Sequence, residues 1–264
     1  MCKLRDMSGS SPWRNSLKDS LAGIGDMGSF TASIFRNFFR HGVNFKEFST
    51  QCYRVGNKSL PLSAATGFIL GLVLTLQSGP TLAKFGAESL LPGMVSLSIL
   101  REIGPVIVAL IVAGKVGSGI GAELASMRVT EQLDAMEVSG ANPISFVVTT
   151  RVLAVTLMLP LLVLFADTLA IIGSYISASA LYSISLELYI QKAFDVIHYS
   201  DLIPTLIKTV IFGFAIGIIG SYKGYNARRG TEGVGEAANS SVVLASLSIF
   251  IIDLLAVQIT HLLT

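Results

Sequence analysis

The sequence predicts an all-α integral membrane protein with an N-terminal interfacial helix, five transmembrane helices and a short cytoplasmic helix. Hydrophobic residues make up 52% of the 264 residues and charged residues only 14%. The mean hydropathy of +0.67 lies far above that of water-soluble domains. Five apolar stretches are each long enough to cross a bilayer, which takes about 20 residues. We divide the chain into a cytoplasmic segment, residues 1–28, an interfacial region, residues 29–58, and a transmembrane bundle, residues 59–264.

The first predicted element is an amphipathic helix that ends near Gly42. Arg36 and Arg40 share one face of this helix, and the apolar residues recur at helical spacing on another: Phe30, Ile34, Phe35, Phe38 and Phe39. Such a helix suits the membrane surface, although packing on the protein's own body gives the same periodicity. Residues 1–28 lack the apolar core and cleavage site of a signal peptide, so we expect a cytoplasmic start.

The predicted spans follow in order. They are Ser59–Ala83, Ser89–Gly114, Val152–Ala180, Leu202–Tyr222 and Ala237–Leu263. The second span contains Arg101 and Glu102 between Pro92 and Pro105, so we expect it to be bent or partly discontinuous. Glycine pairs four residues apart predict close helix packing, and these are Gly67/Gly71, Gly117/Gly121 and Gly213/Gly217.

The distribution of basic residues predicts the orientation in the membrane. Nine Lys and Arg residues precede Ser59, three more lie in residues 115–151 and three in residues 223–229. The loops on the other side hold only Lys84 and Lys192. Because basic loops stay in the cytoplasm, the N-terminus is predicted to be cytoplasmic and the C-terminus periplasmic. The net charge of +2 fits juxtamembrane lysines and arginines and gives no support for nucleic-acid binding.

No catalytic or metal site is expected. Cys2 and Cys52 are the two cysteines and are expected to be free thiols. Gly114–Lys115 is followed by valine, so the phosphate-binding loop of ATPases is missing. The three histidines and the serines match neither a zinc-protease nor a serine-hydrolase motif. We therefore expect no catalytic residues, no metal and no cofactor, and any ATP must be hydrolysed by a partner.

Arg101 and Glu102 are the main candidates for a site inside the membrane. A charge at the bilayer centre costs at least about 2.5 kcal/mol, so each side chain needs a counter-charge, a polar ligand or water. Neighbouring helix positions point about 100° apart, so the two should not pair with each other. A ligand pocket and a purely structural ion pair both remain open. Asp167 and Asp253 also lie within spans, where we expect helix packing or hydration.

The polar segment Arg128–Ser139 predicts a short amphipathic helix at the cytoplasmic surface. Acidic residues recur at spacing three, as Glu131, Asp134 and Glu137, and Leu133 and Met136 share another stripe. Asn142–Pro143 would end it. Periodicity alone favours a solvated connecting helix over a docking helix.

Three motifs stand out in the middle of the chain: Arg101–Pro105 (REIGP), Ala113–Leu124 (AGKVGSGIGAEL) and Met127–Val138 (MRVTEQLDAMEV). Together they resemble the signature of the MlaE-type permeases, the membrane subunits of lipid-transporting ABC systems that work with MCE-domain proteins. The resemblance covers about residues 30–264, which would form the permease domain. It implies a homodimer with a phospholipid cavity between the chains, an ABC ATPase subunit, an external MCE-domain lipid-binding protein and, in some systems, a small cytoplasmic regulator. A bacterial inner membrane is the implied location.

The resemblance also implies roles for individual residues. Those expected at the lipid are Leu100, Arg101, Glu102 and Ile103, with Ile103 in place of the family's leucine. A coupling helix, residues 129–138, would dock on the ATPase through Arg128, Glu131, Gln132, Asp134 and Glu137. Two other function classes stay open: a secondary, ion-coupled transporter that titrates Glu102, Asp167 and Asp253, and a lipid-modifying enzyme, for which no acid–base set is found. The chain lacks recognisable inverted repeats, which counts against the carrier.

Overall fold

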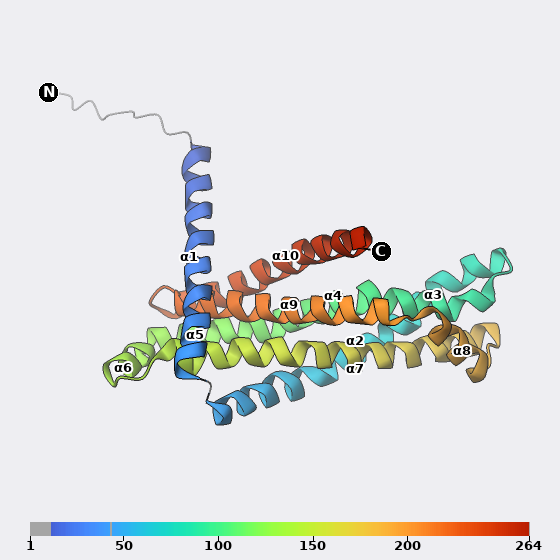
Figure 1. Cartoon of the computed structure of the whole chain (residues 1–264), viewed down its shortest axis with the longest axis horizontal. Helices are drawn as coiled ribbons and strands as arrows, with labels where there is room; N and C mark the ends of the chain where they lie inside the picture. Colours follow the sequence, from blue (N-terminus) through green and yellow to red (C-terminus); the bar gives the residue numbers. More distant parts are fainter. Residues whose placement is uncertain (1–11, 43, 264) are drawn as a thin grey trace.

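The structure of the chain is a computed structural model that describes residues 12–42 and 44–263. The expectations for residues 1–11, including Cys2, lie outside this range. Helices form almost all of the described part, and no strand occurs in it. The long helices run side by side along the long axis of the molecule (Figure 1).

The α-helices, in chain order, have the following bounds. They are α1 Pro12–His41, α2 Phe45–Lys84, α3 Leu91–Ser98, α4 Gly104–Val112, α5 Ser118–Val129, α6 Gln132–Val138, α7 Thr149–Tyr182, α8 Leu186–Val196, α9 Tyr199–Tyr225 and α10 Thr231–Leu263. A 3-10 turn, η1 Glu88–Leu90, precedes α3. Three π-helical segments complete the chain: η2 Ile99–Ile103, η3 Ala113–Gly117 and η4 Ile144–Val148.

Five continuous helical stretches are long and apolar enough to cross a membrane, as the sequence predicts. They are Phe45–Lys84, Glu88–Val129, Ile144–Tyr182, Ser200–Tyr225 and Thr231–Thr260. All are longer than the predicted spans, because their helices continue through polar turns. The first span begins at Phe45 instead of Ser59, since the Asn44 side chain accepts hydrogen bonds from the amides of Lys46 and Glu47 and starts the helix there.

The second span is interrupted where the sequence predicts a break. The π-helical turn η2 lies between α3 and α4 and contains both Arg101 and Glu102. Pro105 lacks a backbone N–H, so it cannot donate to the carbonyl of Arg101 four residues earlier. A π-turn inserts one extra residue and is often found at functional sites. The break is thus a widened turn within one continuous rod.

The first and third spans pack closely because small residues face each other. A Cβ on Gly67 would lie 3.0 Å from Cα of Ala166, and one on Gly71 would lie 2.9 Å from Cα of Ala170. Only glycine lets two backbones approach so closely. Gly213 and Gly217 likewise let α9 approach the backbone of α7 closely, at Thr156 and Val152. The predicted packing role of these pairs is confirmed.

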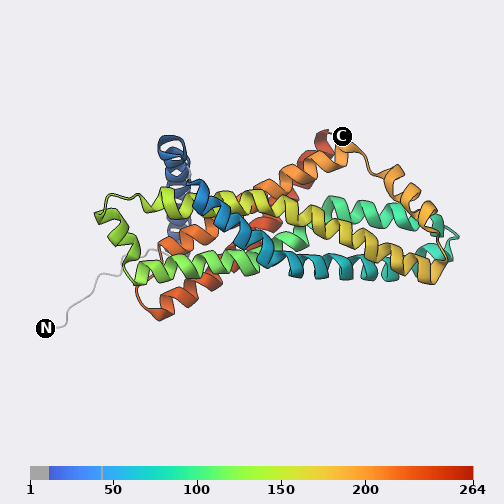
Figure 2. The ribbon, with the colours of Figure 1, turned by 90° about the horizontal axis from the view of Figure 1, so that it is seen from below.

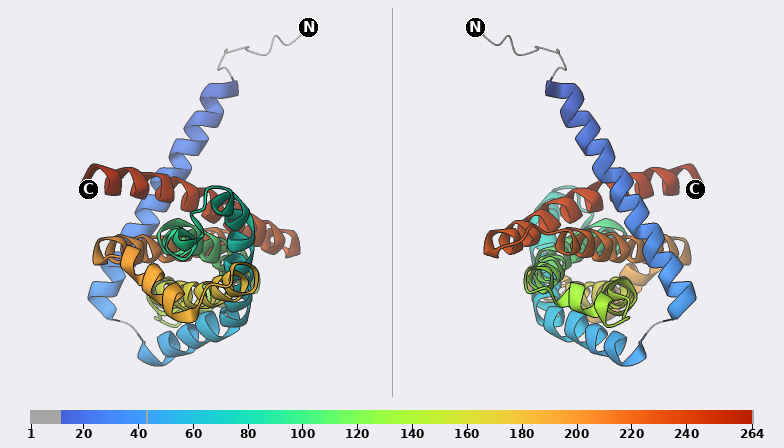
Figure 3. Two further views of the ribbon diagram at one scale, coloured as in Figure 1. Left: turned by 90° about the vertical axis from the view of Figure 1, so that its right-hand side faces the viewer. Right: turned by 90° about the vertical axis from the view of Figure 1, so that its left-hand side faces the viewer.

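Helix α1 crosses one end of the bundle instead of joining it. It stands nearly perpendicular to the long axis, and its first turns project away from the other helices (Figures 1 and 3). Its inner face is anchored by Phe30, whose ring lies 5.6 Å from Tyr222 and 5.7 Å from Tyr225. Arg36 and Arg40 point to the exposed side. The helix therefore packs on the body through one face, and its place at a membrane surface stays a prediction.

The opposite end of the molecule is formed by η1 and α8, which the sequence did not predict. Figure 2 shows α8 lying beyond the end of α9, near α3 and the last turns of α7. Tyr189 of α8 is almost fully buried, with its ring 5.4 Å from that of Tyr175. Val95 and Ala178 share its apolar cluster. This cluster closes the end of the bundle.

Candidate functional site

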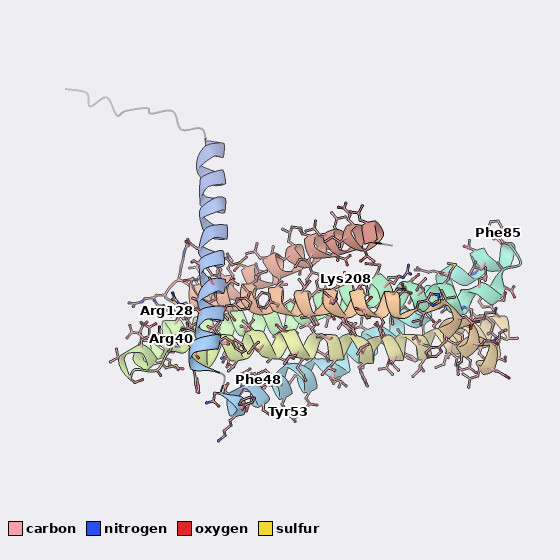
Figure 4. All side chains as sticks on the ribbon, viewed as in Figure 1. Arg40, Phe48, Tyr53, Phe85, Arg128 and Lys208 are labelled. Carbon is pink, nitrogen blue, oxygen red and sulfur yellow. The ribbon has the colours of Figure 1, made fainter. Side chains whose placement is uncertain are left out.

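Five charged side chains meet inside the membrane-spanning part of the molecule. Arg101 and Glu102 come from η2, Asp201 and Lys208 from α9, and Asp253 from α10. Lys208 lies about halfway along the bundle (Figure 4). Charges at this depth are stable only with partners, and here every one of them has one.

Lys208 is the centre of the cluster. Its Nζ donates to Oε2 of Glu102 at 2.8 Å and to the carbonyl of Arg101 at 2.8 Å, and it lies 2.9 Å from Oδ1 of Asp253. Pro105 has no N–H, so this carbonyl lacks its usual donor four residues later in the helix. Lys208 is only 5% exposed, so its three donors replace the water it has lost. It joins the second, fourth and fifth spans.

Arg101 forms a second, separate pair. Its Nε donates to Oδ1 of Asp201 at 3.0 Å, and its Nη2 reaches the same oxygen. The other oxygen of Asp201 accepts from the backbone N–H of His198 at 3.2 Å, so Asp201 also caps the start of α9. As predicted, Arg101 and Glu102 pair with other helices and not with each other.

All members of the cluster except Asp253 line a cavity of about 300 Å³. Its lining comes from η2, α9 and α10, with Ser200, Pro204 and Thr205 beside the charges and Ala256 and Val257 on the apolar wall. The side chains of Arg101 and Glu102 are about half exposed, whereas those of Lys208 and Asp201 are buried. The buried groups position the site, and the half-exposed ones can touch a ligand. The cavity combines one polar wall with one apolar wall.

Of the four residues expected to contact the lipid, two line the cavity and two do not. Arg101 and Glu102 line the cavity. Leu100 is buried in the protein, and Ile103 is half-buried outside the cavity lining. Asp201, Lys208 and Asp253 were not among the predicted site residues. Lys208 and Asp253 could have been found, because each is an intramembrane charge that needs a partner.

Asp167 stands apart from this cluster. Its side chain is buried in α7 without a hydrogen-bond partner among the described residues, and it packs against Gly104, directly after η2. A side chain larger than glycine at position 104 would collide with it. The packing role expected for Asp167 therefore fits its place against the π-turn.

The predicted coupling segment folds as a turn followed by α6. Residues 118–129 belong to α5, and Glu131 adopts a left-handed conformation with φ of 57° before α6 begins at Gln132. Arg128 pairs with Asp134, and the Tyr225 hydroxyl donates to Oε1 of Glu137 at 3.1 Å. Leu133 is fully buried beneath the helix. The predicted coupling helix, residues 129–138, is therefore shortened to α6. Val129 is the last residue of α5, and the positive φ of Glu131 separates it from α6.

The polar residues of this segment differ in how many contacts they make with the rest of the protein. Arg128, Asp134 and Glu137 hold α6 against α5 and α9. Glu131 and Gln132 are exposed, and Glu131 has only a loose contact with Arg229 at 3.9 Å. Exposed pairs at this distance contribute little to stability. Arg128 and α6 lie at the end of the bundle that α1 crosses (Figure 4).

No group of three or more His, Cys, Asp or Glu side chains in the described ranges could hold a metal ion. Cys52, the cysteine within those ranges, is a free thiol. The charge cluster offers ion pairs and a cavity, which suit binding of a polar or zwitterionic group.

Known proteins share this sequence over most of its length. The Permease MlaE family matches residues 48–259. A probable ABC transporter permease of Rickettsia typhi is 40% identical over 205 residues, which covers 78% of this chain and 79% of that protein. A probable ABC transporter permease of Synechocystis is 34% identical over 221 residues, covering 84% of each chain.

A plant protein is also similar. The chloroplastic protein TRIGALACTOSYLDIACYLGLYCEROL 1 of Arabidopsis thaliana is 34% identical over 211 residues, which covers 80% of this chain and 60% of the plant protein. The family match includes nearly all of the five membrane helices and the whole charge cluster. The chain therefore belongs to the MlaE permease family and is a multi-pass permease of the bacterial inner membrane.

Proposed function

We propose that this chain is the membrane subunit of an ATP-driven transporter that moves a phospholipid. The observation that carries the proposal is the Arg101–Glu102 cavity, which places half-exposed opposite charges beside an apolar wall within the spans. A phospholipid has a charged head and apolar tails, so it matches a cavity with these two kinds of wall. Membership of a family of ABC permeases supports ATP as the energy source.

The active unit in this proposal is a homodimer. Helix α10 supports it, because only 11% of its most apolar stretch is buried, against 50% for that of α9. Its far face carries large apolar side chains, among them Leu247, Phe250 and Leu254. A second copy packed there would cover the open side of the cavity beside Ala256 and Val257. The 300 Å³ cavities of the two chains would then join into a lipid-sized chamber.

The ATPase partner docks on α6, and an MCE-domain protein receives or delivers lipid at the opposite, periplasmic end. The docking surface consists of the exposed Glu131 and Gln132, while Arg128, Asp134 and Glu137 hold the helix in place. Nucleotide-driven motion of α6 passes through α5 to η3 and η2, since these segments form one rod. The N-terminus is cytoplasmic and the C-terminus periplasmic.

Lipid transfer between reconstituted vesicles tests the proposal. The complex of permease and ATPase should transfer a labelled phospholipid only while ATP is hydrolysed. Arg101→Gln should reduce the transfer rate by at least about tenfold, because a charge-assisted contact is worth about 1.5–3 kcal/mol. Arg36→Gln, on the exposed face of α1, is the matched control and should transfer normally. Transfer by the permease alone under an ion gradient would instead show a secondary carrier.

The docking surface has its own test. Glu131→Lys and Gln132→Lys should abolish co-purification of the ATPase without changing the thermal stability of the permease, because both side chains are exposed. Asp134→Ala is the structural comparison, since it breaks the pair with Arg128 and loosens α6. Undiminished assembly of the two lysine variants would refute docking through these residues.

A further inference from the structure

A second site lies nearer the α6 end of the bundle, in a groove between α2 and the rod formed by α4 and η3. The groove has a volume of about 790 Å³. Lys58 and Lys115 line its polar side, and the apolar side is formed by Pro61, Leu62, Ala65 and Ile111, with Gly114 between the two. Figure 2 shows α2 crossing this rod.

The sequence places the two lysines at the ends of uncharged stretches, where we expect the boundary between water and hydrocarbon. Lys58 directly precedes the uncharged stretch that begins at Ser59, and Lys115 follows the apolar helix α4. Fourteen helical residues, or roughly 20 Å, separate Lys115 from Arg101 along the rod. The groove and the central cavity share no lining residue and are therefore two distinct sites on the same rod.

The charges in this groove are not balanced by the protein. Arg54, Arg101, Arg151 and Lys208 each have a carboxylate partner within 4 Å. Across the described ranges, neither Lys58 nor Lys115 has one; the Lys115 ammonium donates to the backbone carbonyl of Lys58 instead. This contact places the Lys115 ammonium group against the backbone of Lys58. Both lysines are exposed, so an anion that enters the groove can reach their uncompensated charges.

The backbone keeps the groove open. Lys115 and Gly114 belong to the π-turn η3, and a Cβ on Gly114 would meet no atom within 4 Å. Pro61, a proline inside α2, lines the other wall of the groove. The apolar residues next to the lysines can contact the first methylene groups of an acyl chain, while the ammonium groups contact a phosphate.

We infer that this groove binds the phosphate-bearing headgroup of a phospholipid from the leaflet on the α6 side. It is a loading or release site that precedes or follows the Arg101 cavity, and in this respect it rests on the proposed function. Basic side chains near an anionic headgroup each contribute about 1 kcal/mol, so two of them give about 30-fold in affinity.

Native mass spectrometry of the purified complex, titrated with phosphatidylglycerol and separately with phosphatidylcholine, tests this inference. Lys58→Gln combined with Lys115→Gln should weaken phosphatidylglycerol binding about 30-fold. Lys46→Gln, an exposed lysine at the same end but outside the groove, is the charge control. Equal losses in both would mean general surface attraction and would overturn the site.

A steric variant separates the groove from charge effects. Gly114→Phe adds a bulky ring to the groove at a position where a Cβ meets no atom within 4 Å. Gly119→Phe is the matched control, because a Cβ there is equally free but the position lies outside the groove. Only Gly114→Phe should lose bound lipid. Competition by inorganic phosphate would show that the site recognises phosphate alone and would contradict a lipid site. Unchanged binding in both groove variants, in protein that still transfers lipid with ATP, would refute the groove while leaving the proposed function intact.

Discussion

Replacing Lys208 by methionine should destabilise the folded protein strongly. Methionine keeps the length of the side chain but removes the three donors, so Glu102, Asp253 and the Arg101 carbonyl lose their shared partner. Removing one member of a buried ion pair costs about 3–5 kcal/mol. Glu102 is about half exposed and keeps some hydration, which places the expected loss near the lower value, about 3 kcal/mol.

The assay is thermal unfolding of the purified protein in lipid nanodiscs. A loss of about 3 kcal/mol corresponds to a decrease in Tm of roughly 6–12 °C for a chain of this size. The double variant Lys208→Met with Asp253→Asn should regain part of this loss. Position 253 then no longer carries an unpaired charge, although Glu102 still does. A Tm equal to that of the unmodified protein, or a double variant no more stable than the single one, would refute the central role of Lys208.

Three further predictions concern packing and titration. Gly71→Leu should cost at least about 1–3 kcal/mol, because its side chain would separate α2 from α7, whereas Leu at the open Gly25 should be neutral; chemical denaturation measures both. Gly104→Ala should destabilise the second span by forcing Asp167 out of its place, and loss of expression or a lower Tm would show it. Burial raises the pKa of the Tyr189 phenol above its usual value of 10.0, so stability should be constant below about pH 10 and fall as pH rises further; Tyr189→Phe should remove that part of the fall.

Much of the fold follows from hydropathy alone. A stretch of about 20 apolar residues has few alternatives to a membrane helix, so the five spans are confirmed. Their ends are extended by polar turns, because a cap such as Asn44 starts a helix wherever it occurs and hydropathy does not detect it. Helix α8 was missed because it is too short to cross a membrane.

The site was less predictable than the spans. A lone intramembrane charge identified Arg101 and Glu102, but their partners Asp201 and Lys208 lie 100 and 106 residues away, both in α9. Pairing over such distances depends on tertiary packing, for which one sequence gives no signal. Asp253 illustrates the difference, since helix packing or hydration was expected there and an ion pair with Lys208 was found.

The most direct test of the account is to ask what occupies the Arg101 cavity. A photoreactive amino acid in place of Val257, on the apolar wall, can be crosslinked in native membranes and the adduct identified by mass spectrometry. The account predicts a phospholipid adduct whose amount changes when the ATPase partner is held in its ATP-bound state. The same residue at Ile172, on the exposed surface of α7, should give adducts that do not respond to nucleotide. Identical, nucleotide-independent adducts at both positions would contradict the claim that this cavity carries the transported lipid.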